Sequence, residues 1–521
     1  MEATRALVWF KRDLRIRDHA PLVRAQQLGE ALAFFAFEPE WLSSEEFDPM
    51  HAKFALGCLN ELRAGLADRG LPLLILRGSV VDLLERLYQR TPFTHLLSHE
   101  ETGPGWSWVR DRAVLDWCRT HRVSWEEFTQ TGVVRRLKQR TGWAERWQAR
   151  MDAPEATLTG LFRPARPLLD RAAAVIDEFD RTPQTRTTQA PGERAAWRCL
   201  EGFLQHRASD YRRGLSSPLS ARQHCSRLSP HLAFGTISMR CVHQATEAHI
   251  ASDPASRLAW NLRGFSGRLR WHCHFMQKLE DEPPIEFRPF ARQYDGLREH
   301  DFNAERFEAW CAGRTGFPMI DACMRSLRQT GWLNFRMRAM LVSFASYHLW
   351  LHWRPTGLFL AKQFLDFEPG IHWSQMQMQS GTTGINTLRI YSPTKQALDH
   401  DPLGHFIRKW IPELERVPGT HLAQPWTMDA SAQASSHCQI GVDYPRPIVD
   451  EKQALLDARA RLHALRRSDA AREEADRIQD RHGSRKSGLP ASGRTGRRRR
   501  SKGTEPAPVQ IDLFDPLHAP D

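Results

Sequence analysis

The 521-residue chain lacks several patterns that would place it in a common class of protein. Its nine cysteines show no C-x-x-C pair and no metal-like grouping, so we expect reduced thiols and no bound metal. The N-terminus has no apolar signal-peptide core, and no apolar run reaches about 18 residues. We therefore expect a soluble, cytoplasmic protein without a membrane partner. No G-x-G-x-x-G follows the first expected strand, so the standard dinucleotide fingerprint is absent.

What the chain does contain is tryptophan and positive charge. It has 18 Trp but only 6 Tyr, and its formal net charge is +12. Most of the Trp residues are expected in cores, yet there are enough for some to stack on flat rings or bases. The charge suits an anionic partner, nucleic acid first, although part of it belongs to a basic C-terminal tail.

The first part of the chain has the pattern of an α/β domain. Short apolar runs at residues 5–10, 31–37, 71–78 and 95–100 predict strands, with helical patterns between them. Strands that alternate with helices predict a parallel sheet with ligand sites at the carboxyl ends of the strands. From residue 196 the apolar spacing is helical almost throughout, which predicts a second, all-α domain.

Composition divides the chain into five expected segments. They are an α/β domain (1–135), a connector (136–195), a helical domain (196–450), a charged surface helix (451–480) and a disordered basic tail (481–521). The connector is rich in Pro, Thr and Arg, so we expect it to run over the surface.

An acidic loop interrupts the basic, aromatic helical region. The stretch FLDFEPGIHWSQMQMQSGTTGIN, residues 364–386, carries Asp366 and Glu368 and no positive charge. Arg338 lies on a strongly apolar helical segment, where a lone guanidinium would be costly to bury. Two interpretations stay open: a mutual ion pair, or a carboxylate that also accepts a hydrogen bond from a ring N–H of a bound heterocycle.

Two further patterns suit a ligand that carries phosphate or bases. In HCSRLSPHLAFGTIS, residues 224–238, the hydroxyls of Ser226 and Ser229 either hold phosphate or form an ordinary helix cap. An aromatic and basic set suits base stacking and phosphate contact, or alternatively a Trp core with extended Arg side chains. This set comprises Trp271, Trp332, Arg336, Trp350, Trp353, Trp373 and Arg389.

Four long motifs follow one another in the order of a known family. They are LVWFKRDLRIRDHAPL, CSRLSPHLAFGTIS, FEAWCAGRTGFPMIDACMRSLRQTGWLNFRMRAMLVSF and LRIYSPTKQALDHDPLGHFIRKWIPEL. Together they closely resemble the photolyase/cryptochrome family over about residues 5–425. The resemblance implies a Rossmann-like N-terminal antenna domain, a helical FAD domain, and blue-light electron transfer from reduced flavin that splits a DNA pyrimidine dimer.

The resemblance also implies roles for individual residues, and it makes the acidic loop a cofactor clamp. The implied cofactor-binding residues are Tyr211, Cys225, Ser226, Arg227, Leu228, Ser229, Phe265, Arg338, Asp366, Phe367, Glu368 and His372. The implied DNA or substrate contacts are Arg268, Trp271, Arg336, Met378 and Arg389, and the implied catalytic residues are Trp353, Trp373 and His372. Within the clamp, Asp366 is expected to pair with Arg338.

The sequence departs from the family pattern at positions that matter for repair. Arg268 replaces a Glu near the dimer, and His372 replaces the Asn that faces the flavin. The tryptophan relay keeps Trp353 as its middle member. The other departures are Met376 and His300 as inner and outer relay members, Phe335 in place of an Asn, and Met376-Gln377-Met378 in place of W-Q-W. We expect Trp373 to substitute as the inner donor, and His372 to exchange a proton near neutral pH.

The favoured hypothesis is a monomeric, FAD-dependent DNA photolyase. The alternatives are a cryptochrome-like photoreceptor that repairs nothing and a light-independent flavoprotein. The positive charge favours repair, whereas the lost Glu and relay members favour the receptor. A second, antenna chromophore in the first domain fits the family, but the sequence does not identify it.

The tail carries two further predictions. Between Arg485 and Lys502 lie eight positive charges and no acid, which suit a non-specific DNA tether or a solubilising tail. The segment QIDLF, residues 510–514, resembles the pentapeptide by which bacterial DNA-repair and replication proteins bind the sliding clamp. On that hypothesis Gln510 forms hydrogen bonds, and Leu513 and Phe514 fill an apolar pocket.

Overall fold

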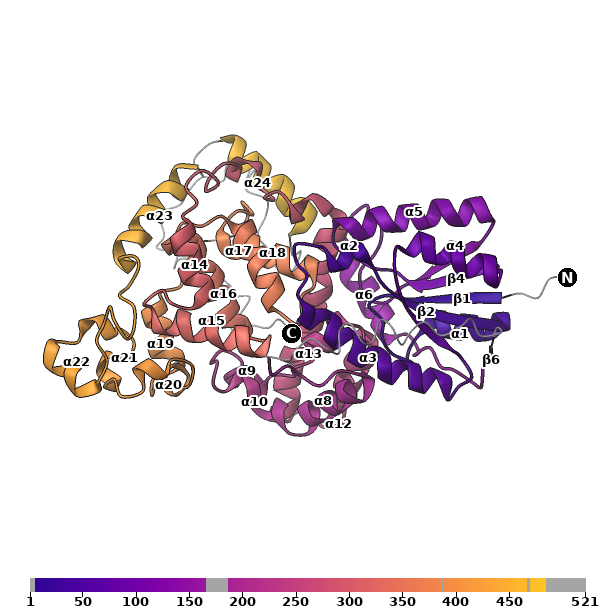
Figure 1. Ribbon diagram of the computed structural model, residues 1–521, viewed down its shortest axis with the longest axis horizontal. Coiled ribbons are helices and arrows are strands. Elements are labelled where there is room, and N and C mark those ends of the chain that lie inside the picture. Colours follow the sequence, from indigo (N-terminus) through magenta and orange to yellow (C-terminus); the bar gives the residue numbers. More distant parts are fainter. Residues whose placement is uncertain (1–4, 165–185, 387, 466–468, 484–521) are drawn as a thin grey trace, which may run out of the picture.

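A parallel β-sheet forms the centre of the N-terminal domain in the computed structural model, which describes residues 5–164, 186–386, 388–465 and 469–483 (Figure 1). The strands are β1 (Arg5–Phe10), β2 (Glu30–Phe37), β3 (Leu73–Arg77), β4 (His95–His99), β5 (Ser124–Phe128) and β6 (Arg163–Pro164). Their order is β3-β2-β1-β4-β5, and β6 pairs with β2. The expected parallel sheet is confirmed. The edge strand β5 was not expected, because its sequence SWEEF is polar and only partly buried.

Helices cover both faces of this sheet, because successive strand residues point to opposite sides. Val8 and Phe10 of β1 pack with α1 and α3, whereas Leu7 and Trp9 pack with α4 and α5. The helices are α1 (Ala20–Leu28), α2 (Pro39–Leu42), α3 (Pro49–Ala67), α4 (Val80–Arg90) and α5 (Gly105–His121). The carboxyl ends of the strands face the second domain (Figure 1).

The second domain is helical, as expected from residue 196 onward (Figure 1). Its α-helices are α8 (Glu193–Gln205), α9 (Tyr211–Gly214), α10 (Ala221–His224), α11 (Ser229–Ala233), α12 (Met239–Ser252), α13 (Arg257–Asp281), α14 (Ala304–Ala312), α15 (Pro318–Thr330), α16 (Phe335–Ser343), α17 (Trp353–Gln363), α18 (Pro369–Ser380), α19 (Pro393–His400), α20 (His405–Trp410), α21 (Gly419–Leu422) and α22 (Ala430–Ser436). Shorter turns are η1 (Arg207–Asp210), η2 (Pro283–Glu286), η3 (Arg292–Tyr294), the π-helix η4 (Phe344–His348), η5 (Pro412–Leu414) and η6 (Pro425–Thr427).

The segment expected as a surface connector is partly core, which corrects that prediction. Its helix α6 (Trp143–Asp152) buries Trp143, Trp147 and Met151 in a cluster with residues of α8, α12 and α13. These three apolar residues recur every four positions, the spacing of a helix face that packs inward. Residues 163–164 join the sheet as β6, and residues 165–185 lie outside the described part of the chain.

The segment expected as one charged surface helix forms two helices, α23 (Glu451–Leu465) and α24 (Asp469–His482). They are not only surface: Ala458, Leu462 and Ile478 are buried in a cluster that includes Tyr347 and Trp350. Charged residues separate these buried residues in the sequence, so the apolar side of the two helices was not recognised from it. The basic run and the QIDLF motif lie outside the described residues.

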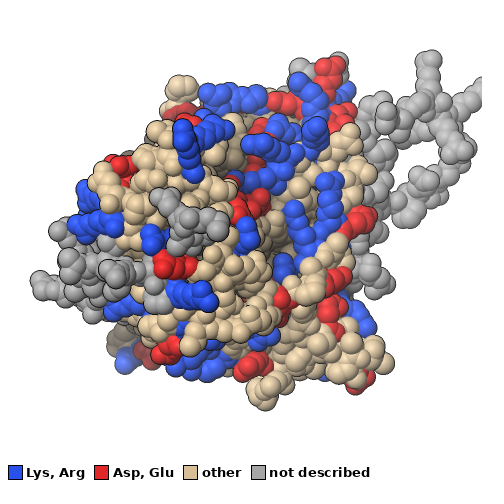
Figure 2. All heavy atoms as spheres, turned by 90° about the vertical axis from the view of Figure 1, so that its right-hand side faces the viewer, with Lys and Arg blue, Asp and Glu red and all other residues tan. Residues whose placement is uncertain are grey.

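Charges are mixed on the face seen from the side of the N-terminal domain. There, Lys and Arg are numerous but interspersed with Asp and Glu (Figure 2). The net positive charge therefore does not form one continuous patch on this face. Among the described residues, no helix combines the length and the hydropathy needed to cross a membrane.

Candidate functional site

The clamp loop, residues 364–368, connects α17 to α18 and is fixed by Arg338. The guanidinium donates from Nη1 to Asp366 Oδ1 at 3.0 Å and from Nη2 to Oδ2 at 2.7 Å. Its Nε donates to the carbonyl of Leu333 at 2.7 Å, and the group lies 4.0 Å from the ring centre of Phe364. Bidentate geometry of this kind fixes orientation as well as charge. The ion pair between the loop and α16 is therefore present.

Glu368, the second acid of the loop, pairs with His272 of α13, a partner that the sequence analysis missed. His272 Nε2 lies 2.7 Å from Glu368 Oε2. Burial opposes protonation of the imidazole, but the charge of Glu368 outweighs it and raises the pKa of His272 to about 10. The side chain is therefore an imidazolium at neutral pH, and its Nδ1–H is buried without a partner among the described residues.

The N-terminal domain supports the clamp loop from behind. His51 of α3 donates from Nε2 to the carbonyl of Phe364 at 2.9 Å. Burial lowers the pKa of His51 to about 4, so the ring is neutral at physiological pH. Arg12, just after β1, reaches the carbonyl of Phe367 at 3.5 Å. The N-terminal domain thus contacts the backbone of the loop at Phe364 and Phe367, and α16 of the helical domain binds the side chain of Asp366 between them.

His372 does not behave as expected from the sequence. Its Nε2 donates to the carbonyl of Gly357 at 2.9 Å, and its ring lies against Phe367. Burial lowers its pKa to about 4. The expectation that His372 exchanges a proton near neutral pH is therefore wrong, because the apolar surroundings disfavour the charged ring.

Trp373 and Trp353 are brought together. Both are buried, and their ring centres lie 5.8 Å apart in a T-shaped arrangement. Trp373 also lies 4.9 Å from the ring of His372. Met376, on the same helix, is buried beside Gly357, where an added Cβ would also meet Trp373. The pair thus joins the start of α17 to α18.

The segment implied to bind the phosphate side packs against α13 about two turns before His272. Tyr211 packs on Phe265 with ring centres 5.8 Å apart, and burial raises its pKa to about 12. Arg227 has φ of 62° and lies 3.7 Å from the ring centre of Trp332. Its Nη1 is buried and has no partner within the described chain.

The ordinary cap proposed as an alternative for this segment is not formed. The N-cap residue of the short helix α11 is Leu228, which makes no side-chain cap hydrogen bond. The Ser226 hydroxyl instead accepts the Leu228 N–H at 3.4 Å, and Ser229 is the first residue of the helix. Cys225 is partly buried, and burial raises the pKa of its thiol to about 11.

The residues implied to meet DNA are spread over α13, α16, α18 and the segment after α18. Arg268 lies 6.0 Å from the ring of Phe335 at the start of α16, and Arg336 lies 5.9 Å from the ring of Tyr391. Trp271 is half-buried, with its ring 5.7 Å from Phe275. Met378 is half-buried on α18, and the backbone carbonyl of Arg389 accepts a hydrogen bond from the Ser343 hydroxyl at 3.2 Å.

Buried polar atoms without partners indicate where a ligand belongs. Such atoms are rare in folded proteins, because leaving them unpaired costs about 1–3 kcal/mol each. In the described part of this domain they include Arg227 Nη1, His272 Nδ1, Asn334 Oδ1, Ser374 Oγ, and both polar atoms of Gln375 and of Gln379. Together with the clamp loop they fit a large cofactor that has a flat, hydrogen-bonding ring.

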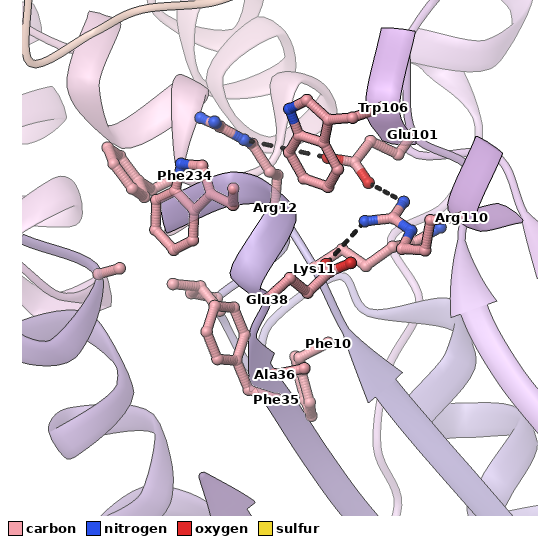
Figure 3. A pocket seen from close by; sticks show the side chains of 13 residues that line it. Phe10, Lys11, Arg12, Phe35, Ala36, Glu38, Glu101, Trp106, Arg110 and Phe234 are labelled. Atoms are coloured by element: carbon pink, nitrogen blue, oxygen red, sulfur yellow. Dashed lines mark hydrogen bonds and ion pairs between the residues drawn. The ribbon is translucent and has the colours of Figure 1, made fainter. Parts of the chain in front are cut away.

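A pocket in the N-terminal domain, separate from the clamp loop, lies at the carboxyl ends of β1 and β2 (Figure 3). Its empty volume is about 430 Å³, part of it open to solvent, and Phe10, Phe35, Trp41, Trp106 and Phe234 are among its walls. Arg110 donates to Glu38 Oε1 at 2.8 Å and to Glu101 Oε2 at 2.6 Å. Burial raises the pKa of Glu38 to about 7.

One buried group has the residue types of a metal site. Asp13, His19 and His99 place ligand atoms within 4.8 Å of one another. His19 Nδ1 accepts the Leu22 N–H, so its Nε2 carries the proton that is donated to Asp13 Oδ2 at 2.9 Å. His99 Nδ1 lies 2.8 Å from the same oxygen. The two nitrogens that face Asp13 are thus used as donors, which fits a structural hydrogen-bond network and not a metal ion.

These features define a two-domain protein. Its helical domain has side chains that suit a ring with polar edges, and its α/β domain has a pocket of its own. Comparison with known proteins names the class. A family model described as DNA photolyase matches residues 6–142, and one described as FAD binding domain of DNA photolyase matches residues 265–464. The chain belongs to the photolyase/cryptochrome family.

Its relatives carry both family names. The deoxyribodipyrimidine photo-lyase of Escherichia coli is 28% identical, with 89% of this chain and 99% of the relative covered. A cryptochrome DASH of Natronomonas pharaonis is 27% identical, with 85% and 98% covered. A bacterial class III photolyase from Agrobacterium tumefaciens has a similar fold, with a TM-score of 0.74 at 24% identity and coverage of 90% and 99%.

An archaeal photolyase from Sulfolobus tokodaii also has a similar fold, and its structure holds two FAD molecules. The TM-score is 0.72 at 22% identity, and the match covers 88% of this chain and 100% of that protein.

Proposed function

We propose that this protein is a light-driven flavoenzyme that splits pyrimidine dimers in DNA. The observation that carries the proposal is the clamp loop, in which Arg338 and His272 hold two neighbouring carboxylates beside a set of unpaired buried polar atoms. The matched FAD-binding domain and the photo-lyase names of relatives support the same cofactor and reaction. When bound and reduced, FAD supplies the electron that light makes available to the dimer.

The chain's own residues would bind and orient this cofactor. Asp366 and Glu368 would present carboxylate oxygens to ring N–H groups, and each is oriented by the cation that it pairs with. Arg227, with an unpaired Nη1, suits the phosphates. Tyr211, Phe265 and Phe367 supply apolar walls that exclude water. Arg268, Trp271, Arg336, Met378 and Arg389 remain the proposed contacts to DNA.

We also propose that Trp373 replaces the lost inner member of the family's electron relay and works with Trp353, the retained middle member. Their 5.8 Å ring separation and complete burial support a direct transfer between them, and Met376 is a poor one-electron donor in comparison. His372 is a neutral spacer in this proposal, because its N–H is donated to the Gly357 carbonyl and its low pKa keeps the ring from taking up a second proton near neutral pH.

The pocket of Figure 3 is the proposed site of the second chromophore. Glu38 Oε2 and Trp106 Nε1, both in the pocket lining, are buried without partners in the described chain. They offer one acceptor and one donor between aromatic walls, which suits a flat heterocycle. Filling the pocket by Ala36→Trp should remove any pigment other than FAD from the purified protein, with the FAD content unchanged. Retention of that pigment would place it elsewhere.

A cryptochrome-like receptor is the second candidate, and Arg268 is the observation that favours it. In place of an acid beside the dimer there is a cation on α13, directed toward the start of α16. The two candidates differ in one result. A photolyase removes dimers from an oligonucleotide under blue light, and a receptor binds FAD and responds to light without removing them.

Docking on a sliding clamp through Gln510, Leu513 and Phe514 is a further proposal, and it rests on the sequence alone. A peptide of residues 504–521 should bind purified clamp in the micromolar range, about −8 kcal/mol. Replacing Leu513 and Phe514 by Ala should abolish that binding. If the native peptide does not bind at a concentration of about 1 mM, the motif has another purpose.

A further inference from the structure

Arg12 lies in the lining of the pocket of the N-terminal domain, and its guanidinium also reaches the proposed flavin site (Figure 3). Its Nη1 donates to the carbonyls of Ala233 at 3.4 Å and Phe367 at 3.5 Å. Phe367 belongs to the clamp loop, whereas Ala233 ends α11, the helix that begins in the segment implied to bind phosphate. One side chain of the N-terminal domain thus contacts both proposed parts of the flavin site.

A chain of ion pairs joins Arg12 to other residues of the pocket lining. Arg12 Nε lies 4.0 Å from Glu101 Oε1. The other oxygen of Glu101 accepts a hydrogen bond from Nη2 of Arg110 at 2.6 Å, and Nη1 of Arg110 donates to Glu38 Oε1 at 2.8 Å. Figure 3 shows the four side chains joined in this order, and all four line the pocket. The pocket and the clamp loop therefore have Arg12 in common.

The contacts of Arg12 are individually weak. Its two hydrogen bonds are close to the longest that count as such, and its distance to Glu101 is that of an ion pair without a direct hydrogen bond. Burial lowers the pKa of Arg12, whereas the charges of Glu101 and Glu368 raise it. The cation is therefore attracted by one acid of the pocket and by one acid of the clamp loop, and its position depends on both.

Glu101 is held more firmly than Arg12. Its side chain is 10% exposed, against 25% for Arg12, and it has the short hydrogen bond to Arg110. Its backbone carbonyl also accepts a hydrogen bond from Arg135 Nη2 at 2.9 Å. A fixed acid orients a cation whose other contacts are weak. Without the charge of Glu101, the guanidinium of Arg12 would be free to turn away from the two carbonyls.

We propose that Arg12 is a positioning residue for the flavin, and that Glu101 sets its position, so that the pocket controls how firmly the clamp loop and α11 hold FAD. The assignment rests on the FAD site of the proposed function. It gives the pocket a second role besides holding a ligand, because a change of charge at Glu101 reaches the flavin site through one guanidinium. Coupling between two sites typically changes affinity about 5- to 150-fold.

The test is a double-mutant cycle in the holoprotein, with Arg12→Met, Glu101→Gln and the double variant. Methionine keeps the apolar stem of arginine without its charge, and glutamine keeps the size of glutamate. Arg24→Met and Glu126→Gln form the control cycle, since this pair joins α1 to β5 by two hydrogen bonds and does not line the pocket. Flavin fluorescence after dilution gives the rate of FAD release, and a reductive titration gives the midpoint potential of the bound flavin.

Each single variant should release FAD at least about fivefold faster than the parent protein. The double variant should stay within about twofold of Arg12→Met, because both substitutions act through the same guanidinium. Arg12→Met should also lower the midpoint potential, since a nearby cation favours the more negative, reduced flavin. Arg12→Lys should keep the potential close to that of the parent and still release FAD faster, because lysine cannot bridge two carbonyls and an acid. The control cycle should change neither quantity.

Additive effects of the two substitutions on FAD release would overturn the assignment and leave the proposed function standing. The same conclusion would follow if Arg12→Met and Arg12→Lys both released FAD at the rate of the parent, or if the midpoint potential were the same in all variants. A parent protein that holds no FAD would contradict the assignment and the proposed function together.

Discussion

At the scale of single residues, the site is built from pairs in which a buried acid and a cation fix each other. Asp366 has a side-chain exposure of 2%, against 25% for Arg338, so the acid is the more deeply buried partner. Glu368 and His272 are both mostly buried, at 12% and 14%. Removing one partner of such a pair leaves an uncompensated charge, which costs more than the pair itself contributes.

Asp366→Ala should therefore lose FAD and destabilise the fold by about 3 kcal/mol. Flavin absorbance and urea unfolding of the purified variant measure the two effects. Asp443→Ala, at an exposed residue, is the control. A variant that stays fully yellow with normal stability would show that the clamp assignment is wrong.

Trp373→Phe should slow photoreduction of the flavin, because phenylalanine is a much poorer electron donor but fills most of the same space. Trp410→Phe, remote in sequence and only partly buried, serves as the control. Light-driven reduction in the presence of an external reductant gives the rate. A rate equal to that of the parent would leave Trp373 as packing only.

At the scale of elements, sequence patterns predicted the features that depend on neighbouring residues. They did not predict the features that depend on contacts between residues far apart in the chain. Apolar runs located β1 to β4, and the two acids marked the clamp. The expected loop was too long, however, because it ends at Glu368, and Pro369 and Gly370 begin α18. The polar edge strand β5 was missed, and so was the pair between His272 and Glu368, which are 96 positions apart. The low pKa of His372 could not be expected either, since it depends on burial by α17 and the clamp loop.

The tail is an element whose role is testable without its structure. A chain that ends at Gly483 keeps α24 and loses the eight positive charges between Arg485 and Lys502. Each phosphate contact steepens the salt dependence of duplex binding by about 0.9 in the log–log slope. The truncated chain should therefore show a slope shallower by about one unit or more. Equal slopes for both chains would end the tether hypothesis.

At the scale of the whole molecule, buried titratable groups determine the pH range of stability. Burial lowers the pKa of several histidines from 6.5, to about 3 for His99 and to about 4 for His51, His231, His348, His372 and His482. A group whose pKa is lower in the folded state favours unfolding as the pH falls below its unfolded value. Raised pKa values of Glu38, Glu280 and Glu286 act in the opposite direction.

Stability should consequently fall as the pH drops from about 6.5 toward 4.5. Each histidine that takes up a proton on unfolding contributes at most about 1.4 kcal/mol per pH unit, and the raised carboxyl groups offset part of that total. His272 acts in the other window: its raised pKa contributes stability below pH 6.5 that is lost as the pH rises toward 10. Urea midpoints at pH 7, 6 and 5 measure the acid limb. Equal midpoints would show that these histidines are not neutral in the fold.

The central claim is that the clamped cofactor serves DNA repair, and loss of dimers under light tests it most directly. Purified, reduced protein is mixed with an oligonucleotide that carries one thymine dimer, and the remaining dimer is measured after blue light and after darkness. Asp366→Ala is treated in parallel as the flavin-depleted control. We predict that dimers disappear only with the parent protein and only in light. A parent protein that holds its full complement of FAD, binds the oligonucleotide and leaves every dimer intact would contradict the claim and identify a receptor.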